Sequence, residues 1–142
     1  MRRVIDIIAN RAEPFLLDSA MNATEASRFL REHHIGGAPV TENGRLVGFC
    51  SERDIVYRVV ARSRDPDETK VAEIMSPDVL AARPGDTVDQ CETMMQNAHV
   101  RHLPIIEDGK VIACISLRNL LVSDLSETRF EVSCLTEYIR GA

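Results

Sequence analysis

The chain has 142 residues, of which 44% are hydrophobic and 27% are charged, and its net charge at pH 7 is −5. This composition is typical of a soluble globular protein, and the length predicts one compact module, because domains most often have about 100–150 residues. The negative charge argues against nucleic-acid binding, and no apolar stretch approaches the roughly 20 residues of a membrane-spanning helix. Residues 4–8 are too short an apolar run for a signal peptide, so we expect a cytoplasmic protein without membrane insertion.

An internal repeat with an offset of 65 residues organises the chain. Residues 34–55 align without a gap on residues 99–120, and six of these 22 pairs are identical. In the first copy the identical positions are His34, Pro39, Glu42, Gly44, Ser51 and Arg53. The repeat predicts two copies of one structural unit.

Each copy should fold as a β-α-β-β-α unit. Residues 4–8 resemble residues 71–75 at an offset of 67, so we expect a loop with two extra residues and a short strand before the first long helix. The long helices should begin near residues 22 and 87, where Asn22 with Glu25 and Thr87 with Gln90 can cap the first amides. Each helix has an apolar stripe, formed by Ala23, Ala26, Phe29 and Leu30 in the first copy and by Val88, Cys91, Met94 and Met95 in the second.

Two β-rich runs follow each long helix. They are joined by Asn43-Gly44 or by Asp108-Gly109, pairs that accept the positive φ angles of a tight hairpin turn. Ser51 and Ser116 then begin a further helix, which in the first copy should cover residues 52–62. We expect the apolar side of this helix to be formed by Ile55, Val56, Val59 and Val60.

The remaining segments are a connector and a C-terminal helix. Residues 63–70 are polar and contain Pro66, which predicts an exposed connector between the copies. Residues 124–142 should form a last helix whose apolar stripe must pack on something. The residues of this stripe are Phe130, Cys134, Leu135, Tyr138 and Ile139.

The cysteines and histidines do not indicate a metal or redox site. Cys50, Cys91, Cys114 and Cys134 are far apart, have apolar neighbours and form no CxxC or Cys/His pattern, so buried thiols are expected rather than bridges. The histidines at 33, 34 and 99 have no carboxylate or cysteine at metal-ligand spacing, so we expect no bound metal. The chain also contains no GxxxxGK[ST], GxGxxG or HExxH motif, and we do not expect an enzyme.

The two segments HIGGAPVTENGRLVGFCSERDI and HVRHLPIIEDGKVIACISLRNL, with the elements around them, resemble a tandem pair of cystathionine-β-synthase (CBS) domains. The resemblance covers roughly residues 4–123 and implies an α/β (α+β) fold of two repeats related by a pseudo-twofold axis, with the C-terminal helix added. We place the first repeat at residues 4–62, the connector at 63–70 and the second repeat at 71–123. The resemblance also implies a homodimer that binds regulatory ligands in clefts between the repeats.

In this family a Ser/Thr-x-x-Asp motif contacts the ribose of the ligand, which assigns that role to Ser51 and Asp54. An ionised carboxylate has two acceptor oxygens for a cis-diol, although Ser and Asp at this spacing also form an ordinary helix cap. The resemblance further assigns phosphate binding to Arg101 and His102; the alternative is that they belong to a solvated turn before a strand. Ile35 and Gly36 are expected beside the base.

The two clefts should be unequal. The second cleft would contain Ser116 and Asn119, facing Gly36 and Gly37, and an amide offers a single acceptor oxygen without charge. Losing a charge-assisted hydrogen bond costs about 1–3 kcal/mol, so we expect a weaker second site and one competent site per chain. Arg53 and Arg118 recur in register and could touch phosphates, or could simply be exposed residues at helix starts.

We therefore expect a stand-alone regulatory protein. Its expected ligand is an adenine nucleotide (AMP, ADP or ATP) or S-adenosylmethionine, and its effector would be a separate, unidentified protein. The alternative is a structural module that forms dimers or docks on a partner while its clefts stay empty. The apolar stripe of the C-terminal helix fits both hypotheses.

Overall fold

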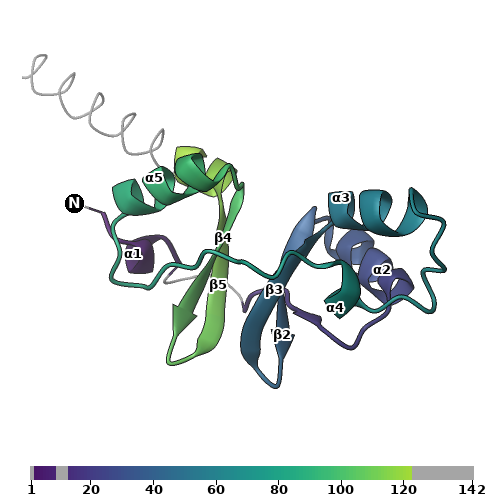
Figure 1. The fold of residues 1–142 in the computed structure, drawn as a ribbon. Coiled ribbons are helices and arrows are strands. Elements are labelled where there is room, and N and C mark those ends of the chain that lie inside the picture. The colour runs from purple at the N-terminus through teal and green to yellow at the C-terminus, as the bar shows by residue number, and fades with distance from the viewer. Residues whose placement is uncertain (1, 9–12, 123–142) are drawn as a thin grey trace, which may run out of the picture.

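The repeat folds as two similar halves, whose strands lie beside one another while helices lie on the outside (Figure 1). A computed structural model describes residues 2–8 and 13–122. The first half contains β1 (Leu17–Asp18), α2 (Ala23–His33), β2 (Gly37–Glu42), β3 (Arg45–Ser51), α3 (Glu52–Ile55) and the π-helix η1 (Val56–Val60). The second half contains α5 (Val88–Ala98), β4 (His102–Glu107) and β5 (Lys110–Ser116), followed by helical residues 117–122. Two short helices, α1 (Val4–Ile8) and α4 (Val71–Ile74), precede these sets of elements.

The hairpins have matching registers. β2 pairs antiparallel with β3, with Pro39 opposite Phe49, and β4 pairs with β5, with Pro104 opposite Cys114. Both turns have positive φ angles, 51° and 81° at positions 43 and 44 and 52° and 78° at positions 108 and 109, as predicted. β1 adds a parallel strand next to β2, whereas the second half has only a single parallel bridge, Ala82 to Ile105, at the equivalent position.

The long helices begin where the capping residues predicted. The Asn22 side chain accepts a hydrogen bond from the Glu25 amide (2.8 Å), and Thr87 forms a reciprocal capping box with Gln90. Both helices end on a left-handed histidine, His34 with φ 53° and His99 with φ 55°. Histidine is among the residues that tolerate this region better than most. The equivalent caps fix the same helix length in both halves.

Each of the two short helices packs in the core of the other half. Val4 and Ile8 of α1 are buried with α5, β4 and β5, while Val71 and Ile74 of α4 are buried with α2, β2 and β3. Figure 1 shows α1 beside α5 and α4 beside β3, so each short helix lies in the half that does not follow it directly in sequence. The chain therefore crosses between the halves, which connects the two cores.

The helix after β3 differs from the prediction. It continues from α3 into a π-helical segment in which the Ala61 amide donates to the Val56 carbonyl (2.9 Å). Of its expected apolar side, Val59 is buried, but Val56 and Val60 are 50% and 67% exposed. Ile55 packs partly on the same core, so only one edge of the expected apolar side is buried. At about 100° per residue, Val56 and Val60 lie on the other edge, which the core does not reach.

The connector is partly packed. The carbonyl of Thr69, a buried residue, accepts a hydrogen bond from the Ala23 amide (2.8 Å), so the expected exposure holds only for part of residues 63–70. The predicted C-terminal helix and its stripe of Phe130, Cys134, Leu135, Tyr138 and Ile139 lie outside the described residues. Within the described ranges, no helix has the length and apolar character needed to span a bilayer.

Candidate functional site

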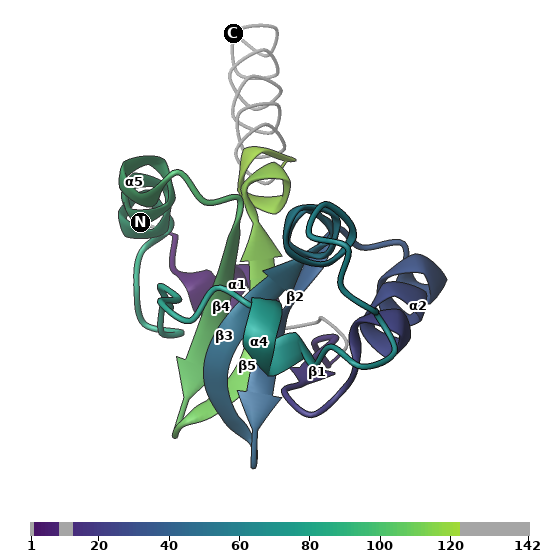
Figure 2. The ribbon, with the colours of Figure 1, turned by 45° about the vertical axis from the view of Figure 1, so that its right-hand side comes forward.

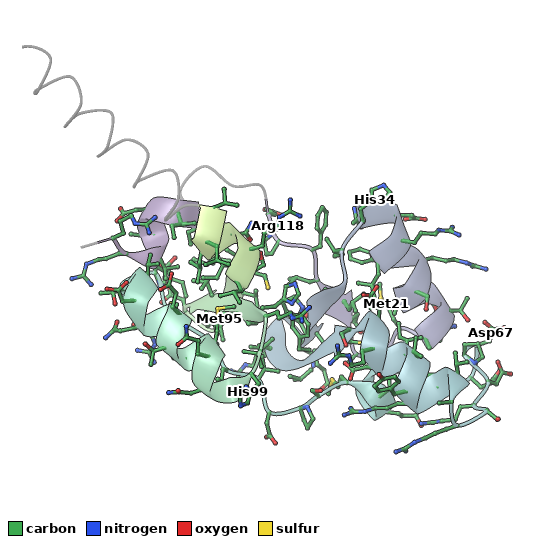
Figure 3. The ribbon with its side chains drawn as sticks, turned by 90° about the horizontal axis from the view of Figure 1, so that it is seen from above. Met21, His34, Asp67, Met95, His99 and Arg118 are labelled. Carbon is green, nitrogen blue, oxygen red and sulfur yellow. The ribbon has the colours of Figure 1, made fainter. Side chains whose placement is uncertain are left out.

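Two cavities lie at the junction of the halves, one on each side of the paired hairpins. The first, of about 400 Å³, is lined by Ser51, Asp54, Arg101 and His102, and we call it the Asp54 cleft. The second, of about 1060 Å³, is lined by Ser116 and Asn119, and we call it the Asn119 cleft. In Figure 3, His34 and Arg118 of the Asn119 cleft lie on one side of the molecule and His99 of the Asp54 cleft lies on the opposite side.

Ser51 and Asp54 form a reciprocal helix cap at the wall of the Asp54 cleft. The Asp54 carboxylate accepts from the Ser51 amide through Oδ2 (2.9 Å), and the Asp54 amide donates to Ser51 Oγ (3.2 Å). The other carboxylate oxygen, Oδ1, lies 3.9 Å from the Arg58 guanidinium. The capping interpretation is therefore correct, and it fixes the carboxylate at the cleft wall.

Ser116 and Asn119 repeat this cap in the second half. The Ser116 amide donates to Asn119 Oδ1 (3.0 Å), and the Asn119 amide donates to Ser116 Oγ (3.0 Å). The Asn119 side chain is therefore placed as the Asp54 carboxylate is, but it has no negative charge.

Arg101 and His102 line both cavities. The Arg101 carbonyl accepts from the Leu117 amide (2.8 Å), which ties this segment to the helix that carries Asn119. The His102 ring stacks on Phe49, with ring centroids 5.4 Å apart, and burial together with the neighbouring Arg101 lowers the pKa of His102. His102 is therefore neutral at pH 7, and Arg101 is the charged member of the pair.

The structure separates the two residues that were expected beside the base. Gly36 lines both clefts, whereas Ile35 lines the Asn119 cleft and is absent from the described lining of the Asp54 cleft. The reason is the left-handed cap at His34, after which the chain turns and the Ile35 side chain packs against the core of the first half. The structure therefore places Ile35 at the wall of the Asn119 cleft and not beside Ser51 and Asp54.

The two clefts differ at one pair of equivalent positions in the size of the side chain. Phe49 lines the Asp54 cleft, and its equivalent at the offset of 65 is the smaller Cys114, which lines the larger Asn119 cleft. A Cβ on Gly37 would lie 2.7 Å from the Phe49 ring, so a larger residue there would displace that ring.

The expectation that mainly glycines face Ser116 and Asn119 is incomplete. Arg101 and Arg118 also line the Asn119 cleft, and Arg53 lines the Asp54 cleft. The two arginines at helix starts are therefore at cleft walls, one in each cleft.

Sequence reasoning did not identify the segment before each long helix as part of the clefts. Glu13, Pro14 and Phe15 line the Asn119 cleft, and residues 78–80 line the Asp54 cleft. Phe15 is held by His33, whose ring stacks on it with centroids 4.1 Å apart. These segments are related by the same offset of 65, so extending the repeat alignment towards the N-terminus could have found them.

The buried thiols do not provide a nucleophile. Burial and the nearby Asp54 carboxylate raise the pKa of Cys50 to about 12, and burial raises that of Cys91 to about 11. A thiol with such a pKa stays protonated at pH 7, and thiolates are the reactive form. The described residues contain no cluster of three or more metal-ligating side chains.

Known proteins share this architecture. The model of the CBS domain family matches residues 4–61 and 71–125. The CBS domain-containing protein YhcV of Bacillus subtilis is 31% identical over 102 residues, which cover 72% of this chain and 72% of that protein. The mitochondrial CBS domain-containing protein CBSX3 of Arabidopsis thaliana is 27% identical over 122 residues, or 82% of this chain and 59% of that protein.

Solved structures agree with this assignment. A protein with CBS domains from Burkholderia ambifaria superposes with a TM-score of 0.80 at 27% identity, covering 87% of this chain and 94% of that one. The CBS domain pair of protein MJ0100, solved with 5′-methylthioadenosine and S-adenosyl-L-methionine, gives a TM-score of 0.76 at 24% identity, covering 91% and 98%. The chain thus belongs to the CBS domain family, of which it carries two domains in tandem.

Proposed function

We propose that this chain is a regulatory CBS pair that binds an adenosyl ligand in the clefts between its repeats and signals the bound state to a partner protein. The observation that carries the proposal is the pair of cavities at the repeat junction, each walled by a Ser-x-x-Asp or Ser-x-x-Asn cap. The CBS domain pair of MJ0100, which shares this fold, was solved in complex with two adenosyl compounds, which supports the choice of this ligand class.

The residues of the Asp54 cleft suit the parts of such a ligand. The ribose hydroxyls would donate to the Asp54 carboxylate beside Ser51, and Gly36 would let the base approach the backbone closely. Arg101 would contact phosphates through its planar guanidinium, and the neutral His102 would add a hydrogen bond rather than a charge. In the Asn119 cleft, Ser116 and Asn119 would hold the ribose more weakly, with Ile35 beside the base.

Ligand binding would be read out by the relative position of the repeats. Arg101 belongs to the second half but lines the cleft that contains Asp54 of the first half. A ligand that contacts both halves stabilises the arrangement in which both contacts are made, and so shifts the population towards it.

Thermal denaturation tests this function. Purified protein is heated with and without AMP, ADP, ATP and S-adenosylmethionine, and a ligand at 100 times its dissociation constant should add about 2.7 kcal/mol of stability. Asp54→Ala should abolish the shift of a ligand in the Asp54 cleft, and Asn119→Ala that of a ligand in the Asn119 cleft. If no adenosyl compound shifts the wild-type melting temperature, the protein does not sense this class of ligand.

A second function, dimer formation or partner docking, is favoured by exposed apolar side chains at one end of the molecule. Val56, Tyr57 and Val60 of η1 and Leu121 and Val122 of the last described helix are between 50% and 67% exposed. Figure 2 shows both helices at the same end. Sedimentation should give a dimer that Tyr57→Asp weakens; a wild-type monomer at all concentrations would exclude a homodimer on this surface.

A further inference from the structure

The two clefts differ in charge. Among the described lining residues, three carboxylates and two guanidinium groups surround the Asp54 cleft, whereas one carboxylate and two guanidinium groups surround the Asn119 cleft. The groups are Glu52, Asp54, Asp78, Arg53 and Arg101 in the first cleft and Glu13, Arg101 and Arg118 in the second. Histidines aside, the Asp54 cleft has an excess of negative charge and the Asn119 cleft an excess of positive charge.

Two positions of the repeat produce this difference. Glu52 and Asp54 of the first repeat correspond to Leu117 and Asn119 of the second. The other charged pairs keep their sign, since Arg53 corresponds to Arg118 and Asp78 to Glu13, and Arg101 is shared. The repeats have therefore kept the cations and changed two anions.

Glu52 lies at the wall of the Asp54 cleft. Its amide donates to the Gly36 carbonyl (2.8 Å), and a Cβ placed on Gly36 would lie 3.6 Å from Glu52 Oε1. The carboxylate is therefore close to the backbone that we assign to the ligand base.

Arg58 offsets only part of this negative charge. It lies 3.9 Å from Asp54 Oδ1, but its Nη1 donates to the carbonyls of Ile74 (2.8 Å) and Met75 (3.1 Å), outside the cleft. Even when Arg58 is included, the groups around the Asp54 cleft carry less positive charge than those around the Asn119 cleft.

We propose that the two clefts of one chain select adenosyl ligands of opposite charge. The Asp54 cleft takes a cationic adenosyl compound of the S-adenosylmethionine type, whose sulfonium and ammonium groups outnumber its single carboxylate. The larger Asn119 cleft takes a phosphorylated adenine nucleotide, whose phosphates are bound by Arg101 and Arg118. This assignment rests on the proposed adenosyl-binding function and revises it in two respects. Phosphates are bound in the Asn119 cleft rather than in the Asp54 cleft, and each chain has two competent sites rather than one.

Calorimetric titration with S-adenosylmethionine and ADP separates the two clefts. Each probe should bind one site per chain, and protein saturated with S-adenosylmethionine should still bind ADP. Arg118→Ala should weaken ADP binding at least about five-fold, the loss expected for a charge-assisted bond, and leave S-adenosylmethionine binding unchanged. Glu52→Gln should weaken S-adenosylmethionine binding about two- to five-fold, as expected for an exposed charge, and the effect should shrink at high salt.

Matched variants control for general effects. Arg53→Ala, the counterpart of Arg118→Ala, should strengthen S-adenosylmethionine binding because it removes a positive charge from the Asp54 cleft. Glu42→Gln removes a charge at the exposed end of β2, outside the described linings of both clefts, and should change neither affinity.

The possible failures are distinguishable. If neither probe binds, the proposed adenosyl-binding function is itself wrong. If both probes bind but compete for one site, or if Arg53→Ala rather than Arg118→Ala weakens ADP binding, the function stands and the selection by charge is refuted.

Discussion

At the junction of the two repeats, equivalent positions carry different side chains. Phe49 lines the Asp54 cleft where Cys114 lines the Asn119 cleft, and Glu52 and Asp54 are matched by Leu117 and Asn119. The backbone around these positions is nearly unchanged, since the hairpin registers, the turns and the caps recur. The comparison teaches that residues of similar chemistry at equivalent positions keep the scaffold the same, whereas exchanges of size and charge make the clefts different.

The cores extend this comparison. Each core includes a short helix that lies at the start of the other repeat, α1 in the second half and α4 in the first. Neither repeat therefore has a complete core made of its own contiguous sequence. A substitution in the short helix of one repeat should destabilise the core of the other.

The largest expected loss of stability comes from a substitution that disrupts the packing of α1 in the second core. Val4→Asp places an unpaired charge among buried residues of the second half and should lower the free energy of unfolding by at least about 3 kcal/mol. Ile5→Asp, one residue along and 42% exposed, should cost less than about 1 kcal/mol. Urea denaturation measures both, and equal losses would mean that α1 does not belong to the second core.

A smaller loss of stability is expected at the hairpin turns, where the two repeats should behave alike. Gly44 and Gly109 have φ angles of 81° and 78°, and a Cβ on either would meet no atom within 4 Å. Valine at either position should therefore cost only backbone strain, about 1–2 kcal/mol, and the two losses should agree. A clear difference between Gly44→Val and Gly109→Val in chemical denaturation would contradict the equivalence of the turns.

Substitutions of the two capping serines should have the same effect on stability but different effects on ligand binding. Ser51→Ala and Ser116→Ala each remove the acceptor of a capping hydrogen bond, and each should lower stability by about 1 kcal/mol. Only Ser51→Ala should also reduce the thermal shift caused by a ligand of the Asp54 cleft. Equal loss of that shift in both variants would show that the clefts are not independent.

The smallest expected effect is the contribution of His102 to the pH dependence of stability, which has no counterpart at Gly37 of the first repeat. Because burial and Arg101 lower the pKa of His102, the folded state binds fewer protons than the unfolded state around the ordinary histidine pKa of about 6.5. This contribution is present above that pH and is lost as the pH falls. His102→Phe keeps a ring against Phe49 and should flatten the decrease in melting temperature between about pH 7.5 and pH 5. If His102→Phe leaves the decrease in melting temperature unchanged, that decrease comes from other titratable groups.

Local patterns were sufficient to predict most of the fold. The capping residues, the hairpin turns and the offset of 65 identified α2, α5 and both hairpins because each depends on neighbours within a few residues. The sequence matched residues 4–8 to residues 71–75 but did not show which core buries each segment, since that depends on packing between distant segments. The π-turn in η1 was missed because an apolar stripe with an ordinary helical period fits residues 52–62 equally well.

The candidate site could be predicted in part. The motif identified the caps at Ser51 and Ser116, and the structure brings Asp54, Arg101 and His102 to one cavity as expected. Ile35 lines the other cleft, because the sequence does not show in which direction the chain leaves the left-handed His34. The neutral state of His102 follows from its burial, which only the fold reveals.

The most direct test of the account is a crystal structure of the protein with S-adenosylmethionine and ADP present together. We predict two adenosyl groups per chain, the ribose of S-adenosylmethionine at Asp54 and the phosphates of ADP between Arg101 and Arg118. ADP phosphates in the Asp54 cleft would contradict the selection by charge. Ligands bound elsewhere, with both clefts empty, would contradict the central claim that the repeat junction is the binding site.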